Sequence, residues 1–306
     1  MLTLDEKKIR KGKPIGLPYQ GSKKKISKKI VEIIKQNFGT DKPIYDIFGG
    51  GGAITAECML NGLEVHYNDL DETVTDMFQK VVSEDRDYLK TLLVSRDEFL
   101  KIREKENKTV DDELKLLVNS FGNKRRTYLC SKEKSDIKYN LAIEIIKNHD
   151  TFSGYKKTET YKNAYHPFDL GKESKNQVLQ QLEQLQLIQQ LERVQQLRQF
   201  EQLEDLRVTN LDYKAFSGVE NAILYLDPPY ENAVLEGYSI DRFNSQSFYD
   251  WAYEMSKKNI VLISSYEISD ERFECVYEFK KARSTLQGGT NNDRTEKLFM
   301  VKKGVK

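Results

Sequence analysis

The pattern of apolar and polar residues predicts two stretches of alternating strands and helices, separated by a long insertion. In the first stretch, apolar residues near helical spacing follow Ser22, a residue type that favours the N-cap position of a helix. These apolar residues are Ile26, Ile30, Val31, Ile33 and Ile34. A strand over 43–48, a glycine loop over 49–52, a helix over 53–61 and a strand over 63–68 come next. They predict a βαβ unit.

The alternation resumes at residue 207. Strand-like runs over 207–213, 222–227 and 259–267 accompany a helical segment over 247–258. Two more strand-like runs within 274–303 surround a turn rich in Gly and Asn, which predicts an antiparallel pair. The whole pattern predicts an α/β sheet that is mostly parallel and has an antiparallel C-terminal hairpin strand. A ligand site in such a sheet is expected at the carboxyl ends of the strands.

The insertion lacks this alternation and predicts mixed helices and loops. We expect 1–75 and 205–306 to form the catalytic domain and 76–204 to form an inserted region. Within 177–206 an apolar residue recurs at every third position, a spacing that winds around an α-helix of about 3.6 residues per turn. The positions are Leu179, Leu182, Leu185, Ile188, Leu191, Val194, Leu197, Phe200, Leu203 and Leu206. We interpret the segment as a long helix buried on several sides. The spacing is not heptad, which disfavours a coiled coil, and a non-helical repeat stays open.

Composition narrows the possible classes of protein. The 49 basic and 48 acidic residues nearly cancel, so any binding of nucleic acid must come from local basic patches. Lys124, Arg125 and Arg126 form one such patch, although a charge run is as often a solvated face, and Arg294 lies in a second candidate region. The three cysteines and three histidines show no metal-binding spacing, and we expect a reducing compartment. No signal peptide and no membrane-spanning run is predicted.

Acidic residues stand at the ends of four predicted strands. Asp46, Asp69, Asp212 and Asp227 would all lie along one edge of the sheet. Each acid alone is more often a turn or capping residue than a functional one. As a set they predict a ligand site.

The glycine loop limits the identity of that ligand. A dinucleotide fingerprint needs a glycine where this chain has Ile54 or Thr55, and no Gly-Lys-Ser/Thr follows as in a phosphate-binding loop. Asp69 stands where an acid can bind both hydroxyls of a ribose. A nucleoside ligand without a pyrophosphate therefore remains, and S-adenosylmethionine fits that description.

The segment "DPPY" over 227–230 follows an apolar strand. Two prolines fix their own backbone torsions and cannot donate hydrogen bonds, so the step after Asp227 is stiff. A rigid turn is the alternative to a catalytic role. Together with "PYQGSK" over 18–23 and "DIFGGGG" over 46–52, in this order, the segment resembles the alpha group of Dam-like DNA adenine methyltransferases. The resemblance covers about residues 17–71 and 207–300. Tyr19 stands where members of the family often have Trp.

The resemblance implies a Rossmann-like methyltransferase sheet that uses S-adenosylmethionine and carries a largely helical inserted target recognition domain. It places Lys23 and Tyr19 in a segment that closes over the methionine end of the cofactor. The implied cofactor-binding residues are Tyr19, Lys23, Asp46, Phe48, Gly49, Gly50, Gly51, Asp69, Asp212 and Asp227. The implied catalytic residues are Asp227, Pro228, Pro229 and Tyr230.

Physical chemistry supports these catalytic roles. The adenine amino nitrogen is a weak nucleophile because its lone pair is delocalised into the ring. Asp227 and the carbonyl of Pro228 can accept its two hydrogens, and the prolines fix these acceptors relative to each other. Tyr230 can stack on a base that has left the duplex.

We therefore predict a site-specific adenine methyltransferase that acts on double-stranded DNA and needs neither a metal nor a membrane. The alternatives are an RNA adenine methyltransferase, a DNA cytosine amino-methyltransferase or a catalytically silent nucleic-acid-binding subunit. We expect a monomer, with a dimer left open, in the cytoplasm of a bacterial or phage-infected cell and associated with its nucleoid. A cognate restriction endonuclease is a further expected partner.

Overall fold

The chain divides into two compact units in a computed structural model of the protein. The residues described are 1–19, 21–164, 182–200, 203–231, 243–279, 295–302 and 304. The first unit comprises Met1–Ile15, Ser22–Thr75 and Gln199–Lys306. The second unit comprises Gly16–Gly21 and Asp76–Arg198.

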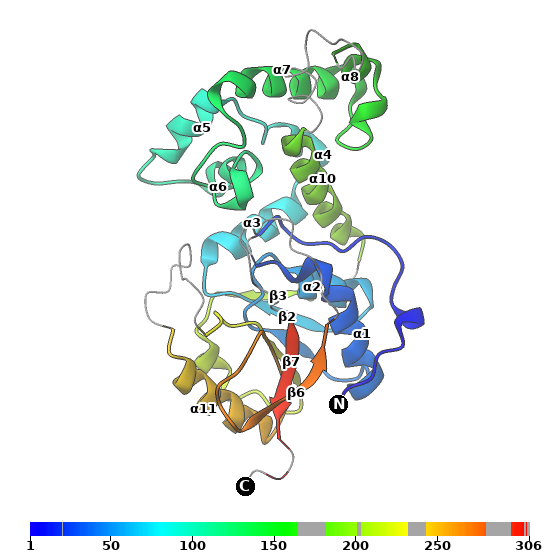
Figure 1. The fold of residues 1–306 in the computed structure, drawn as a ribbon, viewed down its shortest axis with the longest axis vertical. Helices are drawn as coiled ribbons and strands as arrows, with labels where there is room; N and C mark the ends of the chain where they lie inside the picture. The colour runs from blue at the N-terminus through cyan, green and yellow to red at the C-terminus, as the bar shows by residue number, and fades with distance from the viewer. Residues whose placement is uncertain are drawn as a thin grey trace. The chain divides into compact units, whose positions relative to one another are not determined.

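The described part of the first unit contains a seven-stranded sheet with the order β3-β2-β1-β4-β5-β7-β6 (Figure 1). Its strands are β1 (Ile44–Asp46), β2 (Val65–Asn68), β3 (Arg207–Thr209), β4 (Ile223–Leu226), β5 (Ile260–Ser265), β6 (Phe273–Glu278) and β7 (Lys297–Val301). The neighbours from β3 to β5 pair in parallel, whereas β7 pairs antiparallel with both β5 and β6. This topology confirms the mostly parallel α/β sheet with an antiparallel C-terminal hairpin strand.

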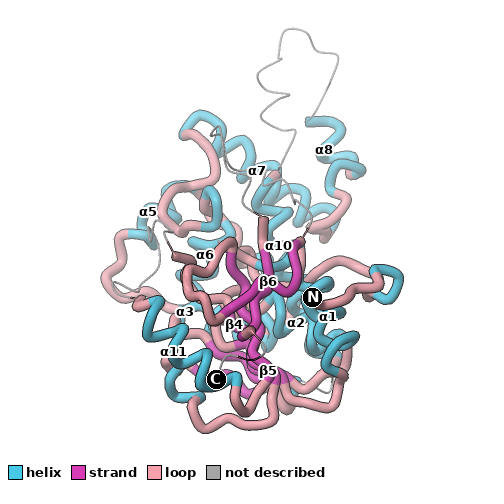
Figure 2. Tube along the Cα trace, turned by 60° about the horizontal axis from the view of Figure 1, so that its bottom comes forward, coloured by secondary structure: helices cyan, strands magenta, loops and turns pink. Residues whose placement is uncertain are grey.

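Strand β4 lies in the middle of the sheet and is buried along its whole length. A continuous apolar run is typical of a parallel strand that is covered on both faces. Leu224 and Leu226 pack in one core cluster with Phe248 and Trp251 of α11 (Ser245–Ser256). Helices α1 (Ser27–Phe38) and α2 (Ala53–Leu60) lie on the other side of the sheet (Figures 1 and 2). Covering both faces leaves the ends of the strands as the place for a site.

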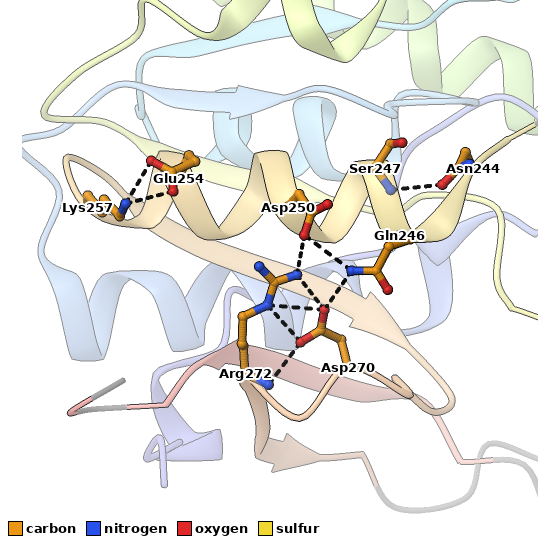
Figure 3. A network of polar contacts seen from close by, with 8 residues as sticks. All are labelled: Asn244, Gln246, Ser247, Asp250, Glu254, Lys257, Asp270 and Arg272. Atoms are coloured by element: carbon orange, nitrogen blue, oxygen red, sulfur yellow. Dashed lines mark hydrogen bonds and ion pairs between the residues drawn. The ribbon is translucent and has the colours of Figure 1, made fainter. Parts of the chain in front are cut away.

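A polar network ties α11 to the loop before β6 (Figure 3). The Arg272 guanidinium lies 2.5 Å from Asp270 in that loop and 2.6 Å from Asp250 of α11. Gln246 donates to Asp250 at 3.2 Å. Arg272 therefore links α11 to the loop before β6.

The second unit is helical in its described part. Its helices are α4 (Arg86–Lys90), α5 (Arg96–Arg103), α6 (Val110–Val118), α7 (Lys132–His149), α8 (Glu159–Ala164) and α10 (Glu183–Gln195). Helix α3 (Glu72–Ser83) begins in the first unit and continues into the second. The described residues also contain the 3₁₀ turns η1 (Glu6–Lys8), η2 (Lys23–Lys25), η3 (Phe121–Asn123), η4 (Tyr155–Lys157), η6 (Gln196–Gln199) and η8 (Tyr213–Phe216). The second unit has a core of its own, which contains Val94, Phe99, Ile102, Leu116 and Tyr128.

The period-three segment forms α10 and η6 over its described residues. The apolar residues at every third position from Leu182 to Leu197 are all buried, and Gln184 and Gln195 of the same helix are buried as well. This confirms a helix that is buried on several sides, but α10 ends at Gln195 and η6 follows. η6 contributes one further buried residue of the series, Leu197. Leu179 lies outside the described residues.

Candidate active site

The predicted acids follow four neighbouring parallel strands. Asp46 ends β1, Asp69 follows β2 directly and Asp227 follows β4 directly. Asp212 comes three residues after the end of β3. Because β3, β2, β1 and β4 are adjacent and parallel, these positions share one edge of the sheet. The arrangement matches the edge that the sequence predicts for ligand binding.

Asp227 is the centre of a cluster of charged and phenolic groups. The Lys23 ammonium lies 2.7 Å from Oδ2 of Asp227. The Tyr230 hydroxyl lies 3.1 Å from Oδ1 of Asp227 and also donates to Glu296. Glu296 lies 3.8 Å from Lys23 and accepts a hydrogen bond of 2.8 Å from Ser264 of β5. The cluster joins η2, the end of β4, the end of β5 and the start of β7.

Burial controls the protonation of this cluster. Burial raises the pKa of Asp227 to about 6, an effect that the Lys23 ammonium opposes and the Glu296 carboxylate reinforces. The pKa of Tyr230 also rises well above its ordinary value, mainly because of burial, and so its hydroxyl keeps its proton. At neutral pH, Asp227 is therefore a carboxylate that can accept hydrogen bonds.

Two prolines and an aromatic ring follow Asp227. Pro228 is buried and Pro229 is half-buried, and neither has a backbone N–H to donate. The Tyr230 ring meets the Tyr266 ring edge-on, with centroids 4.8 Å apart, and the Lys23 ammonium lies 5.1 Å from the Tyr230 centroid. These contacts fix the ring beside the carboxylate.

Asp46 is buried at the end of β1. Its Oδ2 accepts hydrogen bonds from the backbone and the hydroxyl of Thr55, at 3.1 and 2.7 Å. Burial raises the pKa of Asp46 to about 7, which these two hydrogen bonds partly oppose. Its other oxygen, Oδ1, is a buried acceptor for which the described residues supply no donor. A positively charged ligand near this edge would stabilise the carboxylate.

The glycine loop is shaped first by its contact with β2. A Cβ atom at Gly49 would lie 2.4 Å from the Tyr67 ring, so no other residue fits there without displacing that ring. The Tyr67 hydroxyl donates to the Gly50 carbonyl at 2.6 Å. Gly52 has a φ of 68° and starts α2 in a left-handed conformation. At Gly49 the close backbone approach is therefore to the protein's own tyrosine.

Asp69 connects the glycine loop to the start of α3. Its Oδ2 accepts the Gly50 N–H at 2.7 Å, and its Oδ1 accepts the Asp71 N–H at 2.9 Å. Burial raises its pKa, which these two hydrogen bonds oppose. Each carboxylate oxygen has a second lone pair, so Asp69 can still accept hydrogen bonds from a ligand hydroxyl.

Three more of the predicted cofactor residues make contacts with, or belong to, other parts of the protein. Asp212 is exposed and caps η8 by accepting the Lys214 N–H at 2.9 Å. Phe48 is half-buried and packs against the Phe248 ring at a centroid distance of 5.7 Å. Tyr19 is half-buried and belongs to the second unit, whereas Lys23 of the same motif belongs to the first.

Sequence reasoning missed several residues of this edge. Glu296 and Ser264 complete the Asp227 cluster, and Glu296 stands only two positions after Arg294, a residue that the sequence predicts to contact DNA. Leu70 and Leu211 are large apolar residues that are 50% and 47% exposed just after the neighbouring strands β2 and β3. Exposed leucines beside predicted ligand acids are a signal that the sequence alone does not show.

The basic patch occupies a loop of the second unit between Ser120 and Tyr128, which pair as an isolated bridge. Lys124 and Arg126 are exposed, whereas Arg125 is half-buried and lies 2.8 Å from Glu113. The three predicted residues are therefore not equivalent. Phe121 in the same loop is 60% exposed. Arg294 lies outside the described residues.

Two negative findings apply to the described residues. Among them, no helix has both the length and the apolar character needed to span a membrane. The same residues contain no group of three or more His, Cys, Asp or Glu side chains arranged to bind a metal ion.

The fold and the site together define an α/β enzyme with a Rossmann-like sheet, in which a glycine loop and four acids line the carboxyl edge. The model of the D12 class N6 adenine-specific DNA methyltransferase family matches residues 19–281, and the chain belongs to this family. The protein is therefore an adenine-specific DNA methyltransferase, which acts on DNA and requires a methyl donor. This confirms the predicted family and enzyme class.

No curated protein matches the chain. Among solved structures, the rRNA methyltransferase aviRa from Streptomyces viridochromogenes is similar at 10% identity and a TM-score of 0.35, covering 90% of this chain and 84% of that chain.

Proposed function

We propose that the protein moves the methyl group of S-adenosylmethionine to the exocyclic amino group of an adenine flipped out of duplex DNA. It would act in the cytoplasm as a solitary or restriction-modification methylase. The observation that carries the proposal is the Asp227 cluster at the end of β4, where a carboxylate, the Pro228 carbonyl and the Tyr230 ring follow one another. DNA adenine methylation itself follows from the family.

The residues at the sheet edge fit S-adenosylmethionine. This group supplies an electrophilic methyl on a positively charged sulfur. The unpartnered Oδ1 of Asp46 is a buried acceptor at this edge, and a nearby sulfonium would favour the ionised form of this carboxyl. Asp69 would accept ribose hydroxyls. Leu70 and Leu211 would cover the adenine ring of the cofactor, with Asp212 at its amino group.

Asp227 and Pro228 would activate the target nitrogen. Each can accept one amino hydrogen, which draws the nitrogen towards a pyramidal geometry and makes its lone pair available for attack. The Lys23 ion pair, at 2.7 Å, fixes the orientation of the Asp227 carboxylate before the substrate arrives. A preorganised acceptor needs no rearrangement during the reaction.

The amino group of a paired adenine is out of reach inside the duplex, so the base must leave it. Tyr230 would then stack on the extruded base, a contact that contributes about 1–3 kcal/mol in other base–aromatic pairs. Tyr266 holds the Tyr230 ring from the edge.

The second unit would recognise the target. We assign this role to 76–204, with Lys124 and Arg126 contacting phosphates because both are exposed. Arg125 would support the loop through Glu113. The exposed Phe121 in the same loop can contact bases.

A methyl-transfer assay tests the proposal. Labelled S-adenosylmethionine is incubated with duplex DNA or RNA, and the product is digested to nucleosides. We expect N6-methyladenine from DNA alone. Label on RNA or on cytosine would support one of the alternative substrates, and label on neither nucleic acid would reject the enzyme.

A matched pair of variants tests the residue assignment. Asp227→Ala should abolish transfer while calorimetry still detects cofactor binding. Glu220→Ala serves as the control, because Glu220 is an exposed acid that precedes β4 at the opposite end of the strand. Full activity of Asp227→Ala would remove Asp227 from the mechanism.

A further inference from the structure

Glu296 is the acidic member of the Asp227 cluster that no motif includes. It directly precedes β7, and its side chain is 17% exposed. It accepts hydrogen bonds from Tyr230 and Ser264, and it lies 3.8 Å from the Lys23 ammonium. It also lies beyond residues 19–281, the part of the chain that the family model matches.

The hydrogen bonds of Tyr230 cannot all be made at once. The phenol has one proton, yet its oxygen is within hydrogen-bond distance of both Asp227 and Glu296. A phenol donates one hydrogen bond, so only one of the two carboxylates receives it. The other carboxylate faces a phenol oxygen that can only accept.

The charges favour donation to Glu296. Asp227 is already paired with Lys23 at 2.7 Å, whereas Glu296 is 3.8 Å from the same ammonium. The less neutralised carboxylate is the stronger acceptor. Donation to Glu296 therefore leaves Oδ1 of Asp227 with its lone pairs available.

We propose that Glu296 is a positioning residue for methyl transfer. It accepts the one hydrogen bond that the Tyr230 hydroxyl can donate, and this keeps Oδ1 of Asp227 available to the target amino group. This inference rests on the proposed function and adds a residue to it. Without Glu296, the Tyr230 hydroxyl turns to Asp227 and competes with the amino group.

The same arrangement accommodates the proton that the reaction releases. The amino nitrogen forms the new N–C bond with its lone pair, and the electrons of the breaking C–S bond stay on sulfur. The nitrogen then loses one proton to Oδ1 of Asp227. The protonated Asp227 can donate to the Tyr230 oxygen, because the hydroxyl proton of Tyr230 still lies towards Glu296.

A double-mutant cycle tests the proposal. The wild type, Glu296→Ala, Tyr230→Phe and the double variant are compared in single-turnover methyl transfer on duplex DNA with saturating cofactor. We expect Glu296→Ala to slow the wild type by about tenfold or more but to slow the Tyr230→Phe protein by less than about twofold. The effect disappears in the second background because no hydroxyl remains to occupy Asp227.

Two controls separate positioning from a structural effect. Glu267→Gln removes an exposed carboxylate that pairs with Lys297 at 2.5 Å beside Glu296, and it should leave the rate unchanged. Glu296→Gln keeps an oxygen that can accept the Tyr230 proton, so it should retain more activity than Glu296→Ala, and it replaces that variant if the alanine protein does not fold.

The outcomes also separate the inference from the proposed function. Equal slowing by Glu296→Ala in both backgrounds, or no slowing in the wild type, would overturn the role of Glu296. The proposed function would still stand after that result, provided that Asp227→Ala is inactive in the same assay. A wild-type protein that labels no DNA would instead contradict the proposed function.

Discussion

Lys23 and Asp227 form an ion pair of 2.7 Å although they belong to distant parts of the chain. Their side chains are only 11% and 16% exposed. The pair links the 3₁₀ turn η2, which Ser22 caps, to the end of the central strand β4. Lys23 therefore lowers the pKa of Asp227, the carboxylate that we propose binds the target amino group.

Methyl transfer should depend on pH through Asp227. Burial raises the pKa of Asp227 to about 6, and only the carboxylate form can accept the amino hydrogen. We expect the single-turnover rate to fall as the pH drops through about 6. Lys23→Gln removes the charge that lowers this pKa, so its loss of activity should begin at a higher pH. Lys29→Gln, which removes a surface partner of Glu6, should follow the wild-type profile. Identical profiles for all three proteins would contradict this role of Lys23.

Asp46 should make folding stability pH-dependent. Its pKa rises from 3.8 to about 7 on folding. The stability of the fold therefore decreases as the pH rises from about 4, where the unfolded carboxyl ionises, and the loss is complete above about 7. Asp46→Asn cannot ionise and still offers an oxygen to Thr55. Between pH 4 and 8, the free energy of unfolding of the wild type, measured with urea, should fall by up to about 4 kcal/mol relative to that of Asp46→Asn. A difference that stays constant with pH would show that Asp46 is not neutral in the fold.

Gly49→Ala should destabilise the catalytic unit. The added methyl would lie 2.4 Å from the Tyr67 ring, and overpacking of this kind costs about 1–3 kcal/mol. Thermal unfolding measures the loss. Gly218→Ala is the matched control, because a Cβ there has no neighbour within 4 Å, and its melting temperature should not decrease. If Gly49→Ala has the melting temperature of the wild type, the loop can move away from β2.

The two neighbouring arginines of the second unit should differ in their effects. Arg126→Ala should weaken DNA binding and reduce the slope of log affinity against log salt by about one phosphate contact, near 0.9. Arg125→Ala should mainly lower the melting temperature, because Arg125 lies 2.8 Å from Glu113. Fluorescence anisotropy over a range of salt concentrations measures the first effect. Equal salt slopes for the two variants would contradict the different roles assigned to Arg125 and Arg126.

The order of apolar and polar residues predicted those elements of the fold that depend only on residues close together in the sequence. The apolar run of β4 and the βαβ unit around the glycine loop were predicted within a few residues. Ser22 caps the short turn η2, and α1 begins only at Ser27, because three consecutive lysines form a separate 3₁₀ turn first. The spacing of apolar residues does not reveal this separation of the 3₁₀ turn from the helix.

The candidate site also contains residues that the sequence predicts and residues that it does not. Asp46, Asp69 and Asp227 could be predicted because each ends a strand that is recognisable in the sequence. Glu296 could not, since its contacts with Tyr230 and Ser264 exist only because β7 lies beside β5. The supporting role of Arg125 was also hidden, because Arg125 lies in a loop and its partner Glu113 is in helix α6.

The position of β7 also has a consequence for the synthesis of the protein. The last strand of the described chain inserts between β5 and β6, both of which are made before it. Until Lys297–Val301 are synthesised, the buried strand β5 lacks the partner that pairs with its edge in the folded sheet, and unpaired strand edges promote aggregation. The same strand brings Glu296 to the cluster. The Asp227 cluster is therefore complete only once β7 has paired between β5 and β6.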